Sequence, residues 1–160
     1  MTQIAAIIQA RSASTRFPGK CLVPINGVPM LEHIVNTCKN FIDVILAVPN
    51  GDKPLIEWAI SKGVRYSEGS ETNLLERYYG AAIQYKLDRI MRLTGDCPCV
   101  QIQDIVLMSM VGHVADFASN CVDYCVDGFE VEVISFRALE WAYKMTNDRY
   151  DREHVTSYIK

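Results

Sequence analysis

The chain has 160 residues and a net charge of −3, with 49% hydrophobic and 22% charged residues. This length and composition predict one globular domain spanning residues 1–160. An acidic chain offers no broad basic face, so we expect no nucleic-acid partner. No apolar stretch approaches the roughly 20 residues that cross a bilayer, so we expect no membrane partner either.

The six cysteines raise the question of a disulfide scaffold. The chain is not small, and its amino terminus lacks the basic segment and the long apolar run of a secretory signal peptide. Cys97 with Cys99, and Cys121 with Cys125, also lack the paired CxxC spacing of a zinc site. We therefore expect reduced thiols and a cytoplasmic protein.

Short apolar runs alternate with longer amphipathic segments, which is typical of βαβ units and of a mostly parallel sheet. The predicted fold class is α/β, with three layers (α/β/α) around a mostly parallel central sheet. The expected strands are 2–9, 43–48, 64–66, 88–93, 115–118 and 130–134. The expected helices are 29–38, 53–62, 70–85, 102–111 and 135–145, and a further helical segment is expected at 151–159. Ser70 is the expected cap of the helix at 70–85.

The first predicted strand runs into a loop of small residues that carries three cations, Arg11, Arg16 and Lys20. Open α/β sheets bind ligands at the carboxyl ends of their strands. Backbone N–H groups and the side chains of Arg and Lys bind phosphate oxygens. The alternative is a solvated surface loop. Neither GxGxxG nor GxxxxGK[ST] occurs in the chain, so this is not one of the common phosphate motifs.

A carboxylate follows another predicted strand, in the run Thr94-Gly95-Asp96. The carboxyl ends of parallel strands meet at one edge of a sheet, so we expect this run beside Gln9-Ala10-Arg11. A magnesium-bound nucleoside triphosphate needs donors for its phosphates and a hard oxygen ligand for its metal. Asp96 supplies such an oxygen, and Gly95 lets the backbone approach a ligand. The alternative for Asp96 is a helix cap before Pro98.

A second acidic group consists of Asp127, Glu130 and Glu132. Alternation along the predicted strand places Glu130 and Glu132 on one face, where they would form a second carboxylate site. The alternative is a charged strand edge that resists aggregation. For His154 we favour a structural or sugar-contacting role over acid–base catalysis.

The first loop resembles the signature IIQAR-x-x-STR-x-PGK of the nucleotidyltransferases that activate sugars with CTP. The chain is similar above all to the spore-coat polysaccharide biosynthesis protein F type, and more distantly to the synthetases of CMP-activated acidic sugars. The signature is met at residues 7–11, 14–16 and 18–20, and further similarity follows in order at 29–33, 69–70, 75–79, 92–98, 119–120, 127–128, 131–133 and 151–156.

The resemblance implies the nucleotide-diphospho-sugar transferase fold and cytidylyl transfer from CTP to a sugar, with release of pyrophosphate, for polysaccharide or glycan precursors. It strengthens Mg²⁺ as the cofactor, with Asp96 as a ligand. The relatives usually complete the metal site with a later acidic residue, beyond the point where this chain ends, so Glu130 or Glu132 would have to take its place. Arg11, Lys20 and Asp96 are the candidate catalytic residues. The candidate nucleotide-binding residues are Gln9, Ala10, Arg11, Ser14, Arg16, Lys20, Ser70, Arg77 and Thr94.

The sequence also departs from the family, with Ser12-Ala13 for the usual Met-Gly, and with Asn73 and Glu130 in place of Asp. The family continues beyond the His-Val-Thr segment, whereas this chain stops at Lys160, so we expect uncovered apolar surface and a homodimer. Two other functions stay open. In the first, the chain is a non-catalytic homologue that binds a nucleotide or a sugar. In the second, it is a glycosyltransferase that uses nucleotide sugars.

Overall fold

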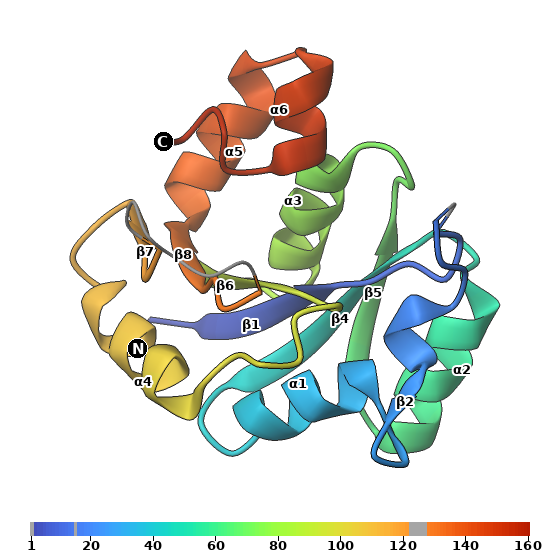
Figure 1. The fold of residues 1–160 in the computed structure, drawn as a ribbon. Coiled ribbons are helices and arrows are strands. Elements are labelled where there is room, and N and C mark those ends of the chain that lie inside the picture. The colour runs from blue at the N-terminus through green and yellow to red at the C-terminus, as the bar shows by residue number, and fades with distance from the viewer. Residues whose placement is uncertain (1, 15, 122–127) are drawn as a thin grey trace.

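The computed structural model describes residues 2–14, 16–121 and 128–160. A six-stranded sheet in the order β5-β4-β1-β6-β8-β7 forms the centre (Figure 1). Its first four strands are parallel, and β8 pairs antiparallel with both β6 and β7. The strands are β1 (Ile4–Gln9), β4 (Asp43–Pro49), β5 (Arg65–Gly69), β6 (Arg89–Thr94), β7 (Phe117–Ser119) and β8 (Glu132–Ser135).

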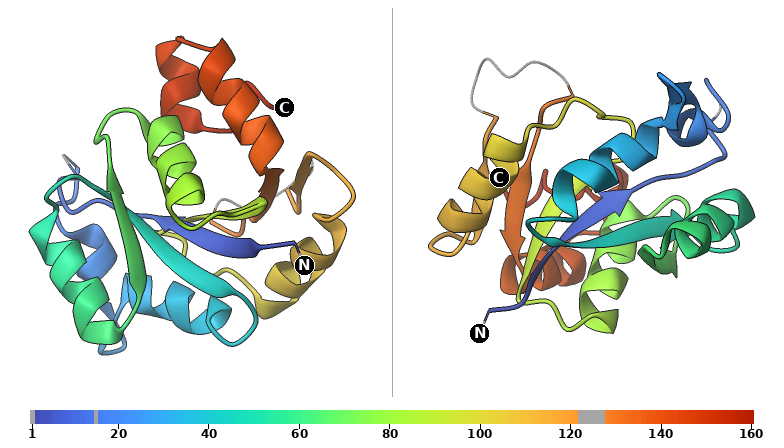
Figure 2. Two further views of the ribbon diagram at one scale, coloured as in Figure 1. Left: turned by 180° about the vertical axis from the view of Figure 1, so that it is seen from behind. Right: turned by 90° about the horizontal axis from the view of Figure 1, so that it is seen from below.

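Helices cover both faces of this sheet, which gives the three-layer α/β/α arrangement predicted from the sequence (Figures 1 and 2). Helices α1, α2 and α4 pack on one face, and α3 and α5 pack on the other, with α6 against α3. The helices are α1 (Met30–Cys38), α2 (Lys53–Lys62), α3 (Leu74–Gln84), α4 (Ile102–Val111), α5 (Phe136–Met145) and α6 (Arg149–His154), together with a short 3-10 helix, η1 (Lys20–Leu22).

Two hydrophobic cores lie on the two sides of the sheet. Along β1, Ala6 and Ile8 belong to the core under α1, α2 and α4, while Ala5 and Ile7 belong to the core under α3 and α5. Successive side chains of a strand point to opposite faces, so a strand covered on both sides is apolar throughout. None of the helices in the described ranges has the length and apolar character of a membrane span.

The helix before β6 begins later than the sequence predicts. Asn73 is the N-cap of α3, because its Oδ1 accepts a hydrogen bond from the backbone N–H of Glu76 at 3.0 Å. Ser70 does not cap the helix. Its Oγ accepts the N–H of Asn73 at 3.0 Å and closes the turn before it. Helices α2 and α4, in contrast, have the predicted bounds, and Ser135 caps α5 as expected.

A short β-hairpin is absent from the predicted elements. Strands β2 (Pro24–Ile25) and β3 (Val28–Pro29) pair antiparallel across Asn26 and Gly27. Both turn residues have positive φ, 51° and 81°, as a two-residue hairpin turn with native twist requires. Asn-Gly between apolar residues is a strong hairpin signal, so this element was readable from the sequence.

The expectation of reduced thiols holds only in part. Cys21, Cys38, Cys97 and Cys99 are free thiols, but Cys121 is disulfide-bonded. The missing CxxC spacing argues against a zinc site. It does not argue against a disulfide, because a disulfide requires only that two sulfur atoms lie close together in the fold. Cys125 lies outside the described residues.

Candidate functional site

The two strand ends singled out in the sequence meet in the structure. Lys20 Nζ lies 2.5 Å from Asp96 Oδ2, although the residues are 76 positions apart. Both side chains are about one-third exposed, at 33% and 32%. A cation from the first loop and the carboxylate after β6 therefore share one solvent-accessible position at the carboxyl edge of the sheet.

The backbone of Gly95 fits directly against the end of β1. Its N–H donates to the carbonyl of Gln9 at 2.8 Å. A Cβ at Gly95 would lie 2.7 Å from that carbonyl oxygen and 3.0 Å from Ala10 Cβ, closer than the backbone tolerates. The glycine therefore serves the contact between the two loops, whereas the sequence suggested an approach to a ligand.

The first loop folds back on itself through its own backbone. Gly19 N–H donates to Ser12 O at 2.8 Å, and Gly19 has a φ of 71°, which glycine adopts readily. Arg11 and Arg16 are exposed, and within the described ranges neither side chain forms an ion pair or a hydrogen bond. The loop thus presents two uncompensated cations beside the Lys20–Asp96 pair, while Thr15 lies outside the described residues.

A carboxylate that the sequence analysis missed anchors this loop. Asp52 is buried, and its Oδ2 accepts the N–H of Ser12 at 2.8 Å. Its Oδ1 faces the N–H of Leu55 at 3.5 Å and caps α2. An Asp just before a helix that starts with Lys-Pro signals the cap, but the contact with Ser12, 40 residues away, has no local signal.

Arg77 holds the loop between β5 and α3. The side chain is buried, and its guanidinium donates to the carbonyl of Ser70 at 2.6 and 2.8 Å and to that of Glu71 at 3.0 Å. Burial lowers the pKa of Arg77 from its ordinary value. The structure therefore gives Arg77 a loop-positioning contact, and direct binding of nucleotide by Arg77 and Ser70 stays a prediction.

Glu132 lies in the sheet rather than beside Asp96. Its Oε2 is 2.7 Å from Arg92 Nη1 on the neighbouring strand, and its Oε1 is 2.7 Å from Lys160 Nζ. Thr156 Oγ1 donates to the same Oε1 at 3.3 Å. Burial alone would raise the pKa of Glu132, but the charges of Arg92 and Lys160 outweigh it and lower the pKa. With both oxygens engaged, Glu132 gains no support as a metal ligand.

Glu130 stays the better candidate for a second carboxylate. It is half-buried, and its Oε2 accepts the N–H of Gly128 at 3.0 Å. Burial first, then the charge of Asp96, raises the pKa of Cys97 to about 11, and Glu130 adds to that rise. The described part of the chain contains no group of three or more His, Cys, Asp or Glu residues suited to a metal. Asp127 lies outside the described residues.

His154 lies on the surface at the end of α6. It is exposed, and its ring is 4.2 Å from that of Tyr150. Arg152 beside it donates to the carbonyl of Tyr143 at 2.9 Å. This pinned segment fits the structural role favoured from the sequence.

Comparison with known proteins decides the family. The sequence profile of the cytidylyltransferases matches residues 5–160. The chain belongs to the cytidylyltransferase family. This cytidylyltransferase is 35% identical over 164 residues to an uncharacterized protein of Methanocaldococcus jannaschii, covering 98% of this chain and 67% of that protein. It is 29% identical over 178 residues to the spore coat polysaccharide biosynthesis protein SpsF of Bacillus subtilis, covering 100% and 71%.

Solved structures agree with this family assignment. A cytidylyltransferase from Leptospira borgpetersenii superposes with a TM-score of 0.92 at 31% identity, covering 99% of this chain and 71% of that one. A CMP-2-keto-3-deoxy-manno-octonic acid synthetase complexed with CTP has a TM-score of 0.76 at 14% identity, covering 99% and 84%, and shows the shared fold. The expected nucleotide-diphospho-sugar transferase fold and the class of enzyme, a nucleotidyltransferase, are confirmed.

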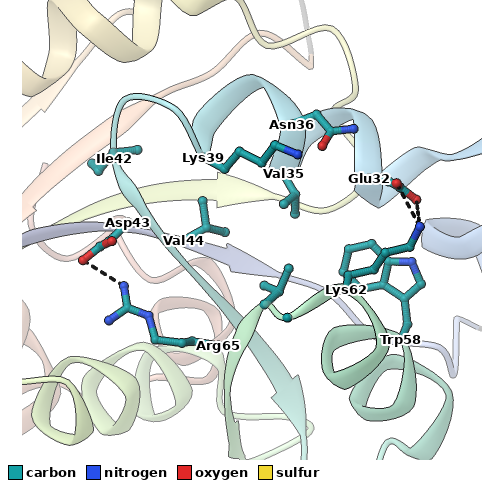
Figure 3. Close-up of a pocket in the computed structure, with 12 residues that line it drawn as sticks. Glu32, Val35, Asn36, Lys39, Ile42, Asp43, Val44, Trp58, Lys62 and Arg65 are labelled. Atoms are coloured by element: carbon teal, nitrogen blue, oxygen red, sulfur yellow. Dashed lines mark hydrogen bonds and ion pairs between the residues drawn. The ribbon is translucent and has the colours of Figure 1, made fainter.

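A separate pocket of about 260 Å³ lies at the amino ends of β4 and β5 (Figure 3), and neither Lys20 nor Asp96 lines it. Two ion pairs border it, Glu32 with Lys62 and Asp43 with Arg65, each at 2.9 Å. Trp58 forms part of its wall. Open α/β sheets bind ligands at the carboxyl ends of their strands, which is the edge opposite to this pocket.

Proposed function

We propose that this chain, acting as one domain over residues 1–160, transfers a cytidylyl group from CTP to a sugar hydroxyl and releases pyrophosphate. The product would serve as a polysaccharide or glycan precursor. The observation that carries the proposal is the half-exposed Lys20–Asp96 pair at 2.5 Å, at the edge where such sheets bind nucleotides. CTP is a cytoplasmic nucleotide, and we propose the cytoplasm as the place of the reaction.

The chemistry asks mainly for positioning and for neutralisation of charge. The sugar oxygen attacks the α-phosphorus in line, and pyrophosphate leaves. Lys20, Arg11 and Arg16 bind the phosphate oxygens and offset the negative charge that develops on the leaving group. The backbone of the first loop, anchored on Asp52 and on Gly19, holds these cations in place and lowers the entropic cost of binding.

We propose Mg²⁺ as the cofactor, with Asp96 as its protein ligand. Magnesium keeps several waters and binds one or two carboxylates together with substrate phosphates. A single half-exposed carboxylate beside a phosphate-binding loop fits that donor set, and Glu130 is the candidate for a second one. When bound, the ion would supply positive charge next to the triphosphate, while Lys20 is released from Asp96 to contact phosphate.

The test is pyrophosphate release from each of the four NTPs across a panel of neutral and acidic sugars. We expect release with CTP and at least one sugar, and much less with the other nucleotides. CTP binding without any release would instead favour the non-catalytic homologue. Release of a nucleoside diphosphate from a nucleotide sugar would favour the glycosyltransferase alternative.

We also propose that the protein forms a homodimer through α4. This helix contains one charged residue, Asp104, so its outer face does not repel a second copy of itself. Large apolar patches exposed to water mark interaction surfaces, and a two-fold contact is the commonest one between identical chains. The exposed apolar side chains on α4 are Ile102, Val106, Leu107, Met110 and Val111. Met110 is the most exposed of them, at 68%.

Light scattering tests the dimer with a matched pair of variants. Met110→Glu places a charge on the α4 face and should yield a monomer. Ile60→Glu places the same charge on an exposed position of α2, where Ile60 is 63% exposed, and should leave the dimer intact. A parent protein with the mass of a monomer at assay concentration would contradict the proposal.

A further inference from the structure

Tyr78 on α3 reaches the carboxyl ends of the two strands that carry the site. It is fully buried, and a reading of tyrosines as core filling accounts for its ring. Its hydroxyl oxygen, however, lies 3.1 Å from the carbonyl of Leu93 on β6 and 3.3 Å from that of Ile7 on β1. It also lies 3.2 Å from Oε1 of Gln9, one residue before the first loop.

The Tyr78 hydroxyl has one hydrogen to donate, and three oxygen atoms lie within its reach. The Tyr78 hydroxyl carries one proton, and its own oxygen can accept. Burial raises the pKa of Tyr78 well above its ordinary value, so the proton stays in place. A buried polar group without a partner costs stability. The two carbonyls are fixed in strands, whereas the Gln9 amide can turn by 180° about its last torsion, which exchanges Oε1 and Nε2.

The turned amide gives the Tyr78 hydroxyl both a donor and an acceptor as partners. Nε2 of Gln9 then donates to the Tyr78 oxygen, and the Tyr78 hydroxyl donates to the carbonyl of Leu93. The remaining amide atom, Oε1, points away from Tyr78. Within the described ranges no other residue forms a hydrogen bond with the Gln9 side chain, which is half-buried at the carboxyl end of β1. Gln9 also pairs in register with Thr94, directly before Gly95 and Asp96.

We propose that Gln9 presents Oε1 to the substrate as a fixed hydrogen-bond acceptor, and that Tyr78 is the positioning residue that sets this polarity. The role toward substrate rests on the proposed function. The matching group is an N–H or O–H donor, either the 4-amino group of cytosine or a sugar hydroxyl. Uracil has a carbonyl oxygen where cytosine has that amino group, so a fixed acceptor would disfavour UTP.

The polarity of the amide can be tested without turnover. In ¹⁵N-labelled protein we expect one of the two side-chain NH₂ protons of Gln9, assigned by their loss in Gln9→Met, to be protected from exchange with water. Tyr78→Phe removes the acceptor and should remove that protection. Tyr85→Phe is the control, because Tyr85 is next to α3 and its hydroxyl donates to a strand carbonyl, Tyr66 O, at 2.7 Å. Unprotected NH₂ signals in the parent, or protection that survives in Tyr78→Phe, would overturn the proposed polarity.

The substrate group is then identified by kinetics on the same variants. If cytosine is the donor, Tyr78→Phe lowers the ratio of kcat/KM for CTP over UTP by about tenfold, the worth of one hydrogen bond of ~1.4 kcal/mol. If a sugar hydroxyl is the donor, the ratio holds and KM for the sugar rises by a similar factor. A merely structural tyrosine would change neither value beyond the change in Tyr85→Phe, which would overturn the substrate role. Absence of pyrophosphate release in the parent would count against the proposed function, while the amide signals would still decide the polarity.

Discussion

Two ion pairs have one partner on β6 or in the loop after it, and their side chains differ in solvent exposure. In the Lys20–Asp96 pair the side chains are 33% and 32% exposed, whereas in the Arg92–Glu132 pair they are 18% and 5% exposed. Water screens the first pair, so its opening costs little, about 1 kcal/mol or less. Removal of one partner from the second leaves a charge in the protein interior, at about 3–5 kcal/mol. A pair at the edge can exchange its partners for a ligand, whereas a buried pair holds strands together.

Lys20→Ala should give the largest effect and should spare the fold. It removes the cation that we place on the phosphates, and turnover should fall by on the order of 10²-fold or more, as when one preorganised donor is lost. Because the pair is half-exposed, the free energy of unfolding should change by less than about 1 kcal/mol. Steady-state pyrophosphate release and urea unfolding measure the two quantities. Parental turnover in Lys20→Ala would remove Lys20 from the site.

Glu132→Gln should affect stability more than Lys20→Ala does, because it breaks the buried pair. We expect a loss of about 3 kcal/mol in the free energy of unfolding. The folded-state pKa of Glu132 lies below its ordinary value of 4.5. Its ion pairs therefore stabilise the parent fully above pH 4.5, and the contribution is lost as the pH falls from there through the folded-state pKa. Urea unfolding from pH 7 to pH 3 should show a flatter profile in the variant. Equal stability of the two proteins at pH 7 would contradict a structural role for this pair.

Asp96→Asn tests the exposed pair from the carboxylate side. The amide keeps the shape of the side chain and removes the charge that we assign to metal binding. In the parent we expect Mg²⁺ to raise the affinity for CTP at least tenfold. In the variant we expect Mg²⁺ to change that affinity little. Calorimetric titration with magnesium or with a chelator gives both affinities. A parent that binds CTP equally well in either solution would rule out this role for Asp96.

Asp52→Asn should have the smallest effect of the four. Asparagine is a good N-cap, so α2 should lose little stability. However, Asn has one acceptor oxygen, and the N–H of Ser12 would lose its partner. We expect KM for CTP to rise about fivefold with nearly unchanged kcat, because the loop is less ordered before binding. Asp52→Ala, which also loses the cap, should in addition lower the melting temperature.

The sequence predicted those parts of the molecule that depend on local patterns. The strands around β1 follow from apolar runs, and α2 and α4 from apolar spacing with a cap or with turn residues at their ends. The meeting of the two loops follows from topology, because β1 and β6 are parallel neighbours, so the loop after β1, which leads to Lys20, and the loop after β6, which carries Asp96, leave the same edge of the sheet. A further local signal, Asn26-Gly27, marks the β2–β3 hairpin.

Other features depend on contacts between distant residues and could not be predicted. Glu132 has the same local pattern as a metal ligand, and only the pairing of β8 with β6 places Arg92 against it, 40 positions earlier. Ser70 and Asn73 are both good caps, and the choice between them depends on how the chain leaves β5. Tyr78 has the spacing of a core residue, and nothing in its neighbours shows that its hydroxyl reaches two strand ends.

The separation of 76 residues between Lys20 and Asp96 also bears on when the site forms. β1, the strand before the first loop, pairs with β4 on one side and with the later β6, the strand before Asp96, on the other. Pairing between such distant segments closes a long loop and is slow compared with helix formation. On a ribosome, the first loop is made long before its carboxylate partner. Binding competence should therefore appear as one of the last events of folding, after α1 and α2 have formed.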